Sequence, residues 1–172
     1  MIGHVHEHYT RATEIVESMF KQGDAMRMFY MNGDHNNMAS VISGWCQGKQ
    51  GEKKPIVINL DFHSDARKSE DGPHSGTWLT DAYHRQEVEH TYIIGLSLLT
   101  NSDACIENLE SFGATYRPYT WDEIQLRGGS RLALPEITAE IIKDISTKYG
   151  PDYPVLFTID GDTIQGLPCS AQ

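Results

Sequence analysis

The feature that most constrains the fold is a short apolar run followed directly by a cluster of polar residues. Residues 55–60 read PIVINL, a run rich in β-branched side chains. Such a run is typical of a strand buried on both faces of a parallel sheet. Asp61, His63 and Asp65 follow at alternate positions. Because side chains at i, i+2 and i+4 of a strand share a side, we expect these three to converge just past the strand's carboxyl end, where open α/β sheets bind ligands.

Apolar runs alternate with helical patterns along the chain. Five expected strands occupy residues 27–31, 55–60, 91–96, 114–119 and 154–160. Expected helices occupy residues 6–22, 37–47, 77–86, 120–126 and 135–148, with one more beginning near Asn101 or Ser102. This alternation predicts an α/β protein with a mostly parallel sheet and right-handed crossovers. No internal repeat or linker divides the sequence, so we expect one domain over residues 1–172.

Composition excludes several classes of function. A formal net charge of −10 argues against a nucleic-acid surface, which needs clustered Lys and Arg. The sequence has no run of about 18 apolar residues and no signal-peptide pattern, so we expect no membrane span and a cytoplasmic protein. The three cysteines, Cys46, Cys105 and Cys169, fit reduced thiols better than a disulfide framework.

Two further polar groups follow apolar runs in the same way. Asp160 and Asp162 end the run PVLFTID, and His35 follows the run at residues 27–31. If parallel strands align their carboxyl ends, these groups meet Asp61, His63 and Asp65 along one edge of the sheet. Alone, a DxD after a strand is a weak signal, because aspartates commonly cap turns and helices, and a single His at a turn is weaker still. Together, however, they crowd charges that are hard to accommodate without cations.

The charge of this donor set suggests the metal. Four carboxylates with two imidazoles would balance two divalent cations, and an oxygen-rich set without thiolate favours Mn²⁺ over a structural Zn²⁺. Two metals about 3.5 to 4 Å apart can share a water and lower its pKa. The sequence therefore predicts a binuclear hydrolytic centre.

These motifs resemble those of the ureohydrolase or arginase-like family, which includes arginases, agmatinases and formimidoylglutamases. Members bind two manganese ions with GGDH-type, DxHxD and DxD motifs, which read here NGDH at 32–35, DFHSD at 61–65 and DGD at 160–162. The resemblance implies a three-layer α/β/α, arginase-like fold. The six ligands that it implies are His35, Asp61, His63, Asp65, Asp160 and Asp162.

Within the family, the sequence is most similar to formimidoylglutamases. Arg67 and the Ser-Gly-Thr segment beginning at Ser75 match residues that follow DxHxD in that branch. Arginases and agmatinases instead carry Asn at the Arg67 position, and a catalytic His where this chain has Trp78 and Leu79. The segment GLPCSAQ also resembles the Gly-Val-Ser-Ala segment that follows DxD in formimidoylglutamases.

The resemblance implies hydrolysis of a linear C–N bond, in the formimino or guanidino group of a small amidine or guanidine, by a metal-bridging hydroxide. Asp65 is the ligand expected to orient the hydroxide and accept its proton. Arg67, His74 and Ser75 follow DFHSD and are the expected substrate contacts, with Arg67 facing a substrate carboxylate. The alternative to substrate binding is that Arg67 and His74 are solvated loop residues.

Members of the family are longer and continue past DxD with a Pro-Gly-Gly-like loop, a substrate-contacting Glu and a further strand and helix. We therefore expect this chain to lack the C-terminal part of the family fold, as a natural short member, a fragment, or a subunit completed by another chain. The alternative function is an impaired binding or assembly subunit that keeps the fold and metal site. A single-zinc deacetylase is disfavoured because that branch retains fewer carboxylates. Family members commonly form trimers or hexamers, so a homo-oligomer is compatible with the sequence.

Overall fold

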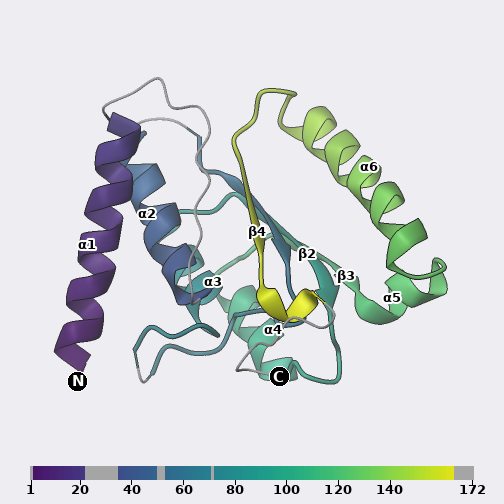
Figure 1. The fold of residues 1–172 in the computed structure, drawn as a ribbon, viewed down its shortest axis with the longest axis horizontal. Helices are drawn as coiled ribbons and strands as arrows, with labels where there is room; N and C mark the ends of the chain where they lie inside the picture. The colour runs from purple at the N-terminus through teal and green to yellow at the C-terminus, as the bar shows by residue number, and fades with distance from the viewer. Residues whose placement is uncertain (1, 22–34, 50–52, 71, 165–172) are drawn as a thin grey trace.

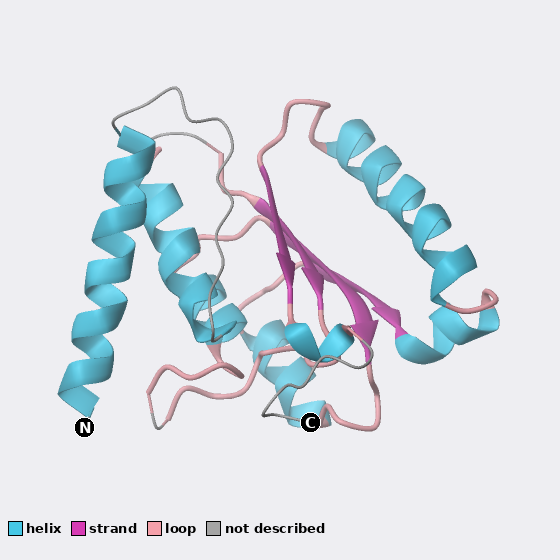
Figure 2. Cartoon of the chain, in the orientation of Figure 1, coloured by secondary structure: helices cyan, strands magenta, loops and turns pink. Residues whose placement is uncertain are grey.

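The fold was analysed in a computed structural model that describes residues 2–21, 35–49, 53–70 and 72–164. Figure 1 shows α1 and α2 on one side of a central sheet and α5 and α6 on the other. Figure 2 shows the magenta strands running between these two helical layers with their arrows pointing the same way. The predicted α/β class and three-layer arrangement are confirmed.

Four parallel strands form the sheet in the described part of the chain. They are β1 Ile56–Leu60, β2 His90–Leu96, β3 Tyr116–Thr120 and β4 Val155–Ile159, in the order β3-β2-β1-β4. In β1, Leu60 pairs with Ile94 of β2 and with Ile159 of β4, so the carboxyl ends of these three strands share one edge. The strand expected at residues 27–31 lies outside the described residues.

The helices follow the sequence pattern closely. They are α1 Ile2–Lys21, α2 Met38–Gly48, α3 Trp78–His84, α4 Asp103–Ser111, α5 Trp121–Leu126 and α6 Ser130–Lys148. Two single turns of 3-10 helix, η1 His35–Asn37 and η2 Gly161–Thr163, lie at the carboxyl edge of the sheet.

The predicted start of the last helix, at Pro135, is wrong. Proline is favoured in the first turn of a helix, but α6 begins at Ser130 and holds Pro135 inside it. Ala133 and Ile137 are both buried, and they stand four residues apart on the same face as the rest of the apolar stripe. Packing of the turn before Pro135 therefore outweighs the one backbone hydrogen bond that proline removes.

Each face of the sheet has its own apolar core. On the α2, α3 and α4 side, the buried side chains include Val57, Ile93, Ile42, Trp78 and Leu109. On the α5 and α6 side, they include Ile56, Tyr92, Tyr119, Ile137 and Ile141. A third cluster joins α1 to α2 through Val16, Phe20, Val41 and Trp45. The amphipathic pattern of α1 is thus used to cover α2 rather than the sheet.

Two minor predictions can be compared with the described residues. Cys46 and Cys105 are free thiols, as expected, and Cys169 lies outside the described part of the chain. None of the helices described is long and apolar enough to cross a membrane. The single domain, the cytoplasmic location and the homo-oligomer stay predictions.

Candidate metal centre

All six predicted ligands gather at the carboxyl edge of the sheet. His35 is the first residue of η1, the DFHSD motif follows β1, and the DGD motif follows β4. The backbone sets both motifs in register, because the N–H of Asp160 donates to Leu60 O at 2.9 Å and the N–H of Asp61 donates to Ile94 O at 3.0 Å. The ligands fall into two groups, within each of which one ligand atom per residue lies within 4.8 Å of the others. The first group is His35, Asp61, Asp65 and Asp160, and the second is Asp61, His63 and Asp162.

The sequence pattern had suggested that the DFHSD side chains converge through strand periodicity. The structure shows a different cause. β1 ends at Leu60, and the chain then turns through a bend. The N–H of His63 donates to Asp61 Oδ1 at 2.7 Å, which closes the first part of this bend. Asp65 has a φ of 48°, in the left-handed region that Asp tolerates better than most residues. The bend, and not the strand, therefore points the three side chains inward.

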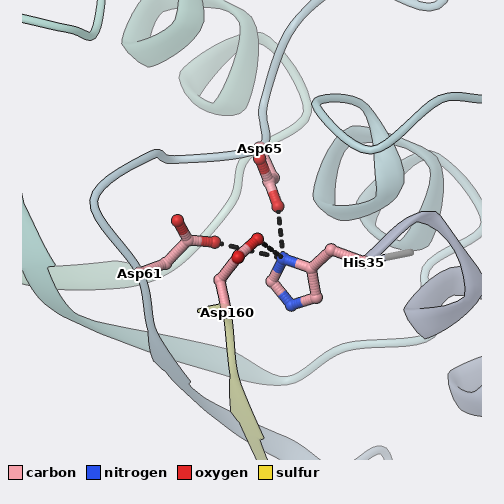
Figure 3. Close-up of side chains that lie close together, drawn as sticks. All are labelled: His35, Asp61, Asp65 and Asp160. Atoms are coloured by element: carbon pink, nitrogen blue, oxygen red, sulfur yellow. Dashed lines mark ion pairs between the residues drawn. The ribbon is translucent and has the colours of Figure 1, made fainter. Parts of the chain in front are cut away.

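The first group is built around one imidazole nitrogen (Figure 3). Nδ1 of His35 lies 2.8 Å from Asp65 Oδ2, 3.0 Å from Asp160 Oδ2 and 3.2 Å from Asp61 Oδ2. Although Nδ1 is buried, it makes no contact with hydrogen-bond geometry to any described residue. One nitrogen and three carboxylate oxygens that face a common point are a donor set suited to a divalent cation.

Crowding of the carboxylates perturbs the protonation of this group. Burial lowers the pKa of His35, but Asp160, Asp61 and Asp65 raise it more strongly, to about 12. Burial raises the pKa of Asp61 to about 6, despite the lowering effect of His35. The imidazolium of His35 thus offsets the carboxylates in the absence of a cation. A divalent cation would compete with this proton for the same lone pair.

The second group shares Asp61 with the first. His63 Nδ1 lies 2.9 Å from Asp162 Oδ2 and 3.8 Å from Asp61 Oδ1. Asp61 is fully buried and directs Oδ2 toward His35 and Oδ1 toward His63. The side chain of His63 is 31% exposed, so the second group is the more open of the two. A carboxylate with one oxygen in each group is the arrangement that bridges a pair of cations.

Three residues that the sequence analysis did not single out support the ligands. His35 Nε2 lies 3.0 Å from Thr158 Oγ1, which leaves Nδ1 to face the carboxylates. Asn59 Nδ2 donates to Asp61 Oδ2 at 3.1 Å, and Trp78 Nε1 donates to Asp65 Oδ2. Asn59 and Thr158 pair side by side on β1 and β4. Asn59 and Thr158 share one signal in the sequence. Each is a polar residue that stands two positions before a ligand in an otherwise apolar run.

The predicted substrate residues divide between two cavities. Arg67 lines a cavity of about 330 Å³ together with His63 and Asp65. His74 and Ser75 instead line a cavity of about 340 Å³ beside Tyr9 of α1. His74 Nδ1 also accepts a hydrogen bond from the N–H of Gly76 at 3.2 Å, a contact within its own loop. The structure therefore brings only Arg67 to the cavity that the ligands line.

Known proteins resemble this chain in sequence and in fold. The chain is 29% identical over 119 residues to a formimidoylglutamase of Geobacillus sp. (strain WCH70), a match that covers 69% of this chain and 34% of that protein. The fold is similar to the crystal structure of formimidoylglutamase from Bacillus subtilis, with a TM-score of 0.74 and 22% identity over 90% of this chain. It is also similar to a Trypanosoma cruzi formiminoglutamase variant with Mn²⁺, with a TM-score of 0.67 and 17% identity over 91% of this chain.

This chain is short beside these relatives, since it covers 45% of the Bacillus subtilis chain and 48% of the Trypanosoma cruzi chain. The Arginase family model nevertheless matches residues 2–166, a range that contains all three ligand motifs. The match therefore spans nearly the whole sequence and agrees with the fold, so the chain belongs to the arginase family.

Proposed function

We propose that this protein is a binuclear manganese hydrolase that cleaves the linear C–N bond of a formimino or guanidino group. The observation that carries the proposal is the position of Asp61, which presents one carboxylate oxygen to each of two ligand groups. When bound, a pair of Mn²⁺ ions supplies a water of lowered pKa as the nucleophile. The donor set supports manganese, because it is rich in carboxylate oxygen and contains no thiolate. The Mn²⁺ in the Trypanosoma cruzi relative agrees with this choice.

The protein's own residues divide the remaining work. Asp65 belongs to the first group and also lines the 330 Å³ cavity, which supports a role for its carboxylate as the acceptor of a proton from the attacking water. Arg67 is exposed on the same cavity, and its backbone N–H donates to Gly76 O at 2.9 Å. Its guanidinium can bind a substrate carboxylate in a bidentate manner. A substrate with an amidine at one end and a carboxylate at the other fits this pair of groups.

The roles of His74 and Ser75 follow from the second cavity. Both residues line it with Tyr9, and none of the six predicted ligands lines it, so direct contact with the reacting amidine is not expected of them. We propose that they contact the substrate at its end distant from the reacting carbon.

A second candidate function is an arginase-family subunit that keeps the fold and the metal centre but acts in binding or assembly. The two groups of ligands support it as well as they support the hydrolase. The two candidates share the metal centre and differ in turnover.

Metal content decides whether the centre exists. The protein should be purified with Mn²⁺ and its metal measured by mass spectrometry, for the wild type and for Asp61→Ala, His63→Ala and Asp162→Ala. We expect about two Mn²⁺ per chain in the wild type and fewer in each variant. Asp152→Ala, which removes an exposed carboxylate in a turn, is the matched control and should keep both ions.

Turnover then separates the two functions. Formamide release from formimino compounds and urea release from guanidino compounds should be measured, with compounds that do and do not carry a carboxylate. Turnover that requires the carboxylate and falls in Arg67→Ala supports the hydrolase. A wild type that is loaded with Mn²⁺ but turns over none of these compounds supports the binding or assembly subunit. A folded wild type without stoichiometric metal refutes both.

A further inference from the structure

Asn101 links the DFHSD bend by hydrogen bonds to the connection that follows β2, although it lies outside every ligand motif. It stands in the segment between β2 and α4. Its Oδ1 accepts a hydrogen bond from the N–H of Ser64 at 2.8 Å. Its Nδ2 donates to Phe62 O at 2.9 Å and to Ser97 O at 2.7 Å. One side-chain amide thus binds the backbone on both sides of His63.

This amide extends the sheet beyond its last residue pairs. The N–H of Asp61 donates to Ile94 O, and the N–H of Ser97 donates to Phe62 O, each at 3.0 Å. After these bonds the chain bends away from β2, and its next backbone groups need other partners. The Asn101 amide has the same donor and acceptor as a peptide group, so it supplies these partners where backbone pairing ends.

Two of the residues that Asn101 contacts, Phe62 and Ser64, lie among the ligands. Phe62 and Ser64 alternate with Asp61, His63 and Asp65 in the sequence, so fixing the two former residues limits the directions of the three latter ones. Ser64 is buried, with 1% of its surface exposed, and directly precedes the left-handed residue Asp65. A change in the Ser64 peptide would therefore move His63 and Asp65 together.

Asn101 also lines the 330 Å³ cavity, which suggests a direct substrate contact as the alternative role. Both amide hydrogens are already engaged, however, with Phe62 O and Ser97 O. A substrate could recruit them only by breaking bonds that hold the bend. The geometry therefore favours a role through the ligands over a role at the substrate.

We propose that Asn101 is a positioning residue of the metal centre, which holds the DFHSD bend in the conformation that aims His63 and Asp65 at the cations. This inference rests on the proposed binuclear centre. Residues that orient metal ligands typically contribute about 10- to 100-fold to metal affinity. Because its contacts flank His63, Asn101 should matter most for the second, more open group of ligands.

The first test compares Mn²⁺ binding in the wild type, Asn101→Ala, Asn101→Asp and Ser43→Ala by calorimetric titration and electron paramagnetic resonance. Asn101→Asp keeps the size of the side chain and the acceptor for Ser64 but removes both donors. Ser43 is the matched control, since it is buried and its hydroxyl donates to Glu87 at 2.7 and 3.0 Å, on the α2 side of the molecule.

We expect both Asn101 variants to bind the second Mn²⁺ roughly 10- to 100-fold more weakly than the wild type. Their resonance spectra should change from that of a coupled pair to that of an isolated ion, whereas Ser43→Ala should keep the coupled pair. Equal second-site affinity in the wild type and Asn101→Asp would overturn the inference while leaving the proposed function intact. A wild type that binds no Mn²⁺ would overturn both.

The second test needs no metal. Hydrogen–deuterium exchange of the metal-free proteins should be followed in a peptide that covers residues 61–66. Loss of the Oδ1 acceptor in Asn101→Ala should speed exchange at the Ser64 N–H, whereas Ser43→Ala should leave it unchanged. Unchanged exchange in this peptide would show that the bend holds itself without Asn101 and would refute the positioning role.

Discussion

The contact between His35 and Thr158 should determine how tightly the first Mn²⁺ is bound. Thr158 is 7% exposed on β4, and its Oγ1 lies 3.0 Å from His35 Nε2. Replacing Thr158 by Val keeps the branched shape that suits a strand and removes only the hydroxyl. The imidazole then keeps a buried polar nitrogen without this partner and loses the contact that fixes its orientation.

The size of the effect follows from that lost contact. A buried donor or acceptor left without its partner costs about 1 to 3 kcal/mol, and each 1.4 kcal/mol is about a tenfold change in an equilibrium constant. Thr158→Val should therefore weaken binding of the first Mn²⁺ by roughly 10- to 100-fold. The metal-free protein should lose about 1 to 2 kcal/mol of unfolding free energy through the same contact.

A matched variant separates these two effects. Thr91 is fully buried on β2, and its hydroxyl lies 2.9 Å from the hydroxyl of Tyr83. Thr91→Val should destabilise the protein by a similar amount and leave the affinity for Mn²⁺ unchanged. Calorimetric titration with Mn²⁺ and denaturant unfolding should be measured for both variants. If Thr158→Val binds the first Mn²⁺ as tightly as Thr91→Val does, Thr158 does not orient His35 and the reasoning fails.

Two further predictions concern pH and the backbone beside the centre. The pKa of His35 is raised to about 12, so the folded metal-free protein holds a proton that the unfolded chain releases above the ordinary His pKa of about 6.5. The unfolding free energy of the metal-free protein should therefore fall as pH rises above about 6.5. Thermal unfolding measured across this pH range should show no such fall for His35→Asn. A His35→Asn variant with the same pH dependence as the wild type would contradict the charge balance. Gly95 has a φ of 100°, and an added Cβ would lie 3.4 Å from Asp61 O. Gly95→Ala should lower the unfolding free energy by about 1 to 2 kcal/mol, because Ala disfavours this φ. Gly113 also has a positive φ but lies in open space, and Gly113→Ala should leave Mn²⁺ binding unchanged.

The sequence alone determined the class of the fold and predicted which residues gather at the carboxyl edge of its sheet. A β-branched apolar run is compatible with few environments other than a buried strand, and its alternation with helical patterns leaves a parallel α/β sheet as the simplest solution. Polar residues just past such strands then meet at one edge, because parallel strands end on the same side. This is why Asp61 and Asp160 could be placed together although 99 positions separate them.

Only the tertiary structure decided how the ligands are aimed and supported. His35 and Thr158 are 123 positions apart, and no local pattern links them. Asp65 itself adopts the left-handed conformation. It lies in a bend whose Ser64 N–H donates to Asn101, a residue of the connection between β2 and α4. Strand periodicity is a property of neighbouring residues, whereas a bend beyond the strand takes its shape from contacts across the fold. The membership of the two groups could therefore be predicted from residue types, whereas their geometry depended on packing between distant segments.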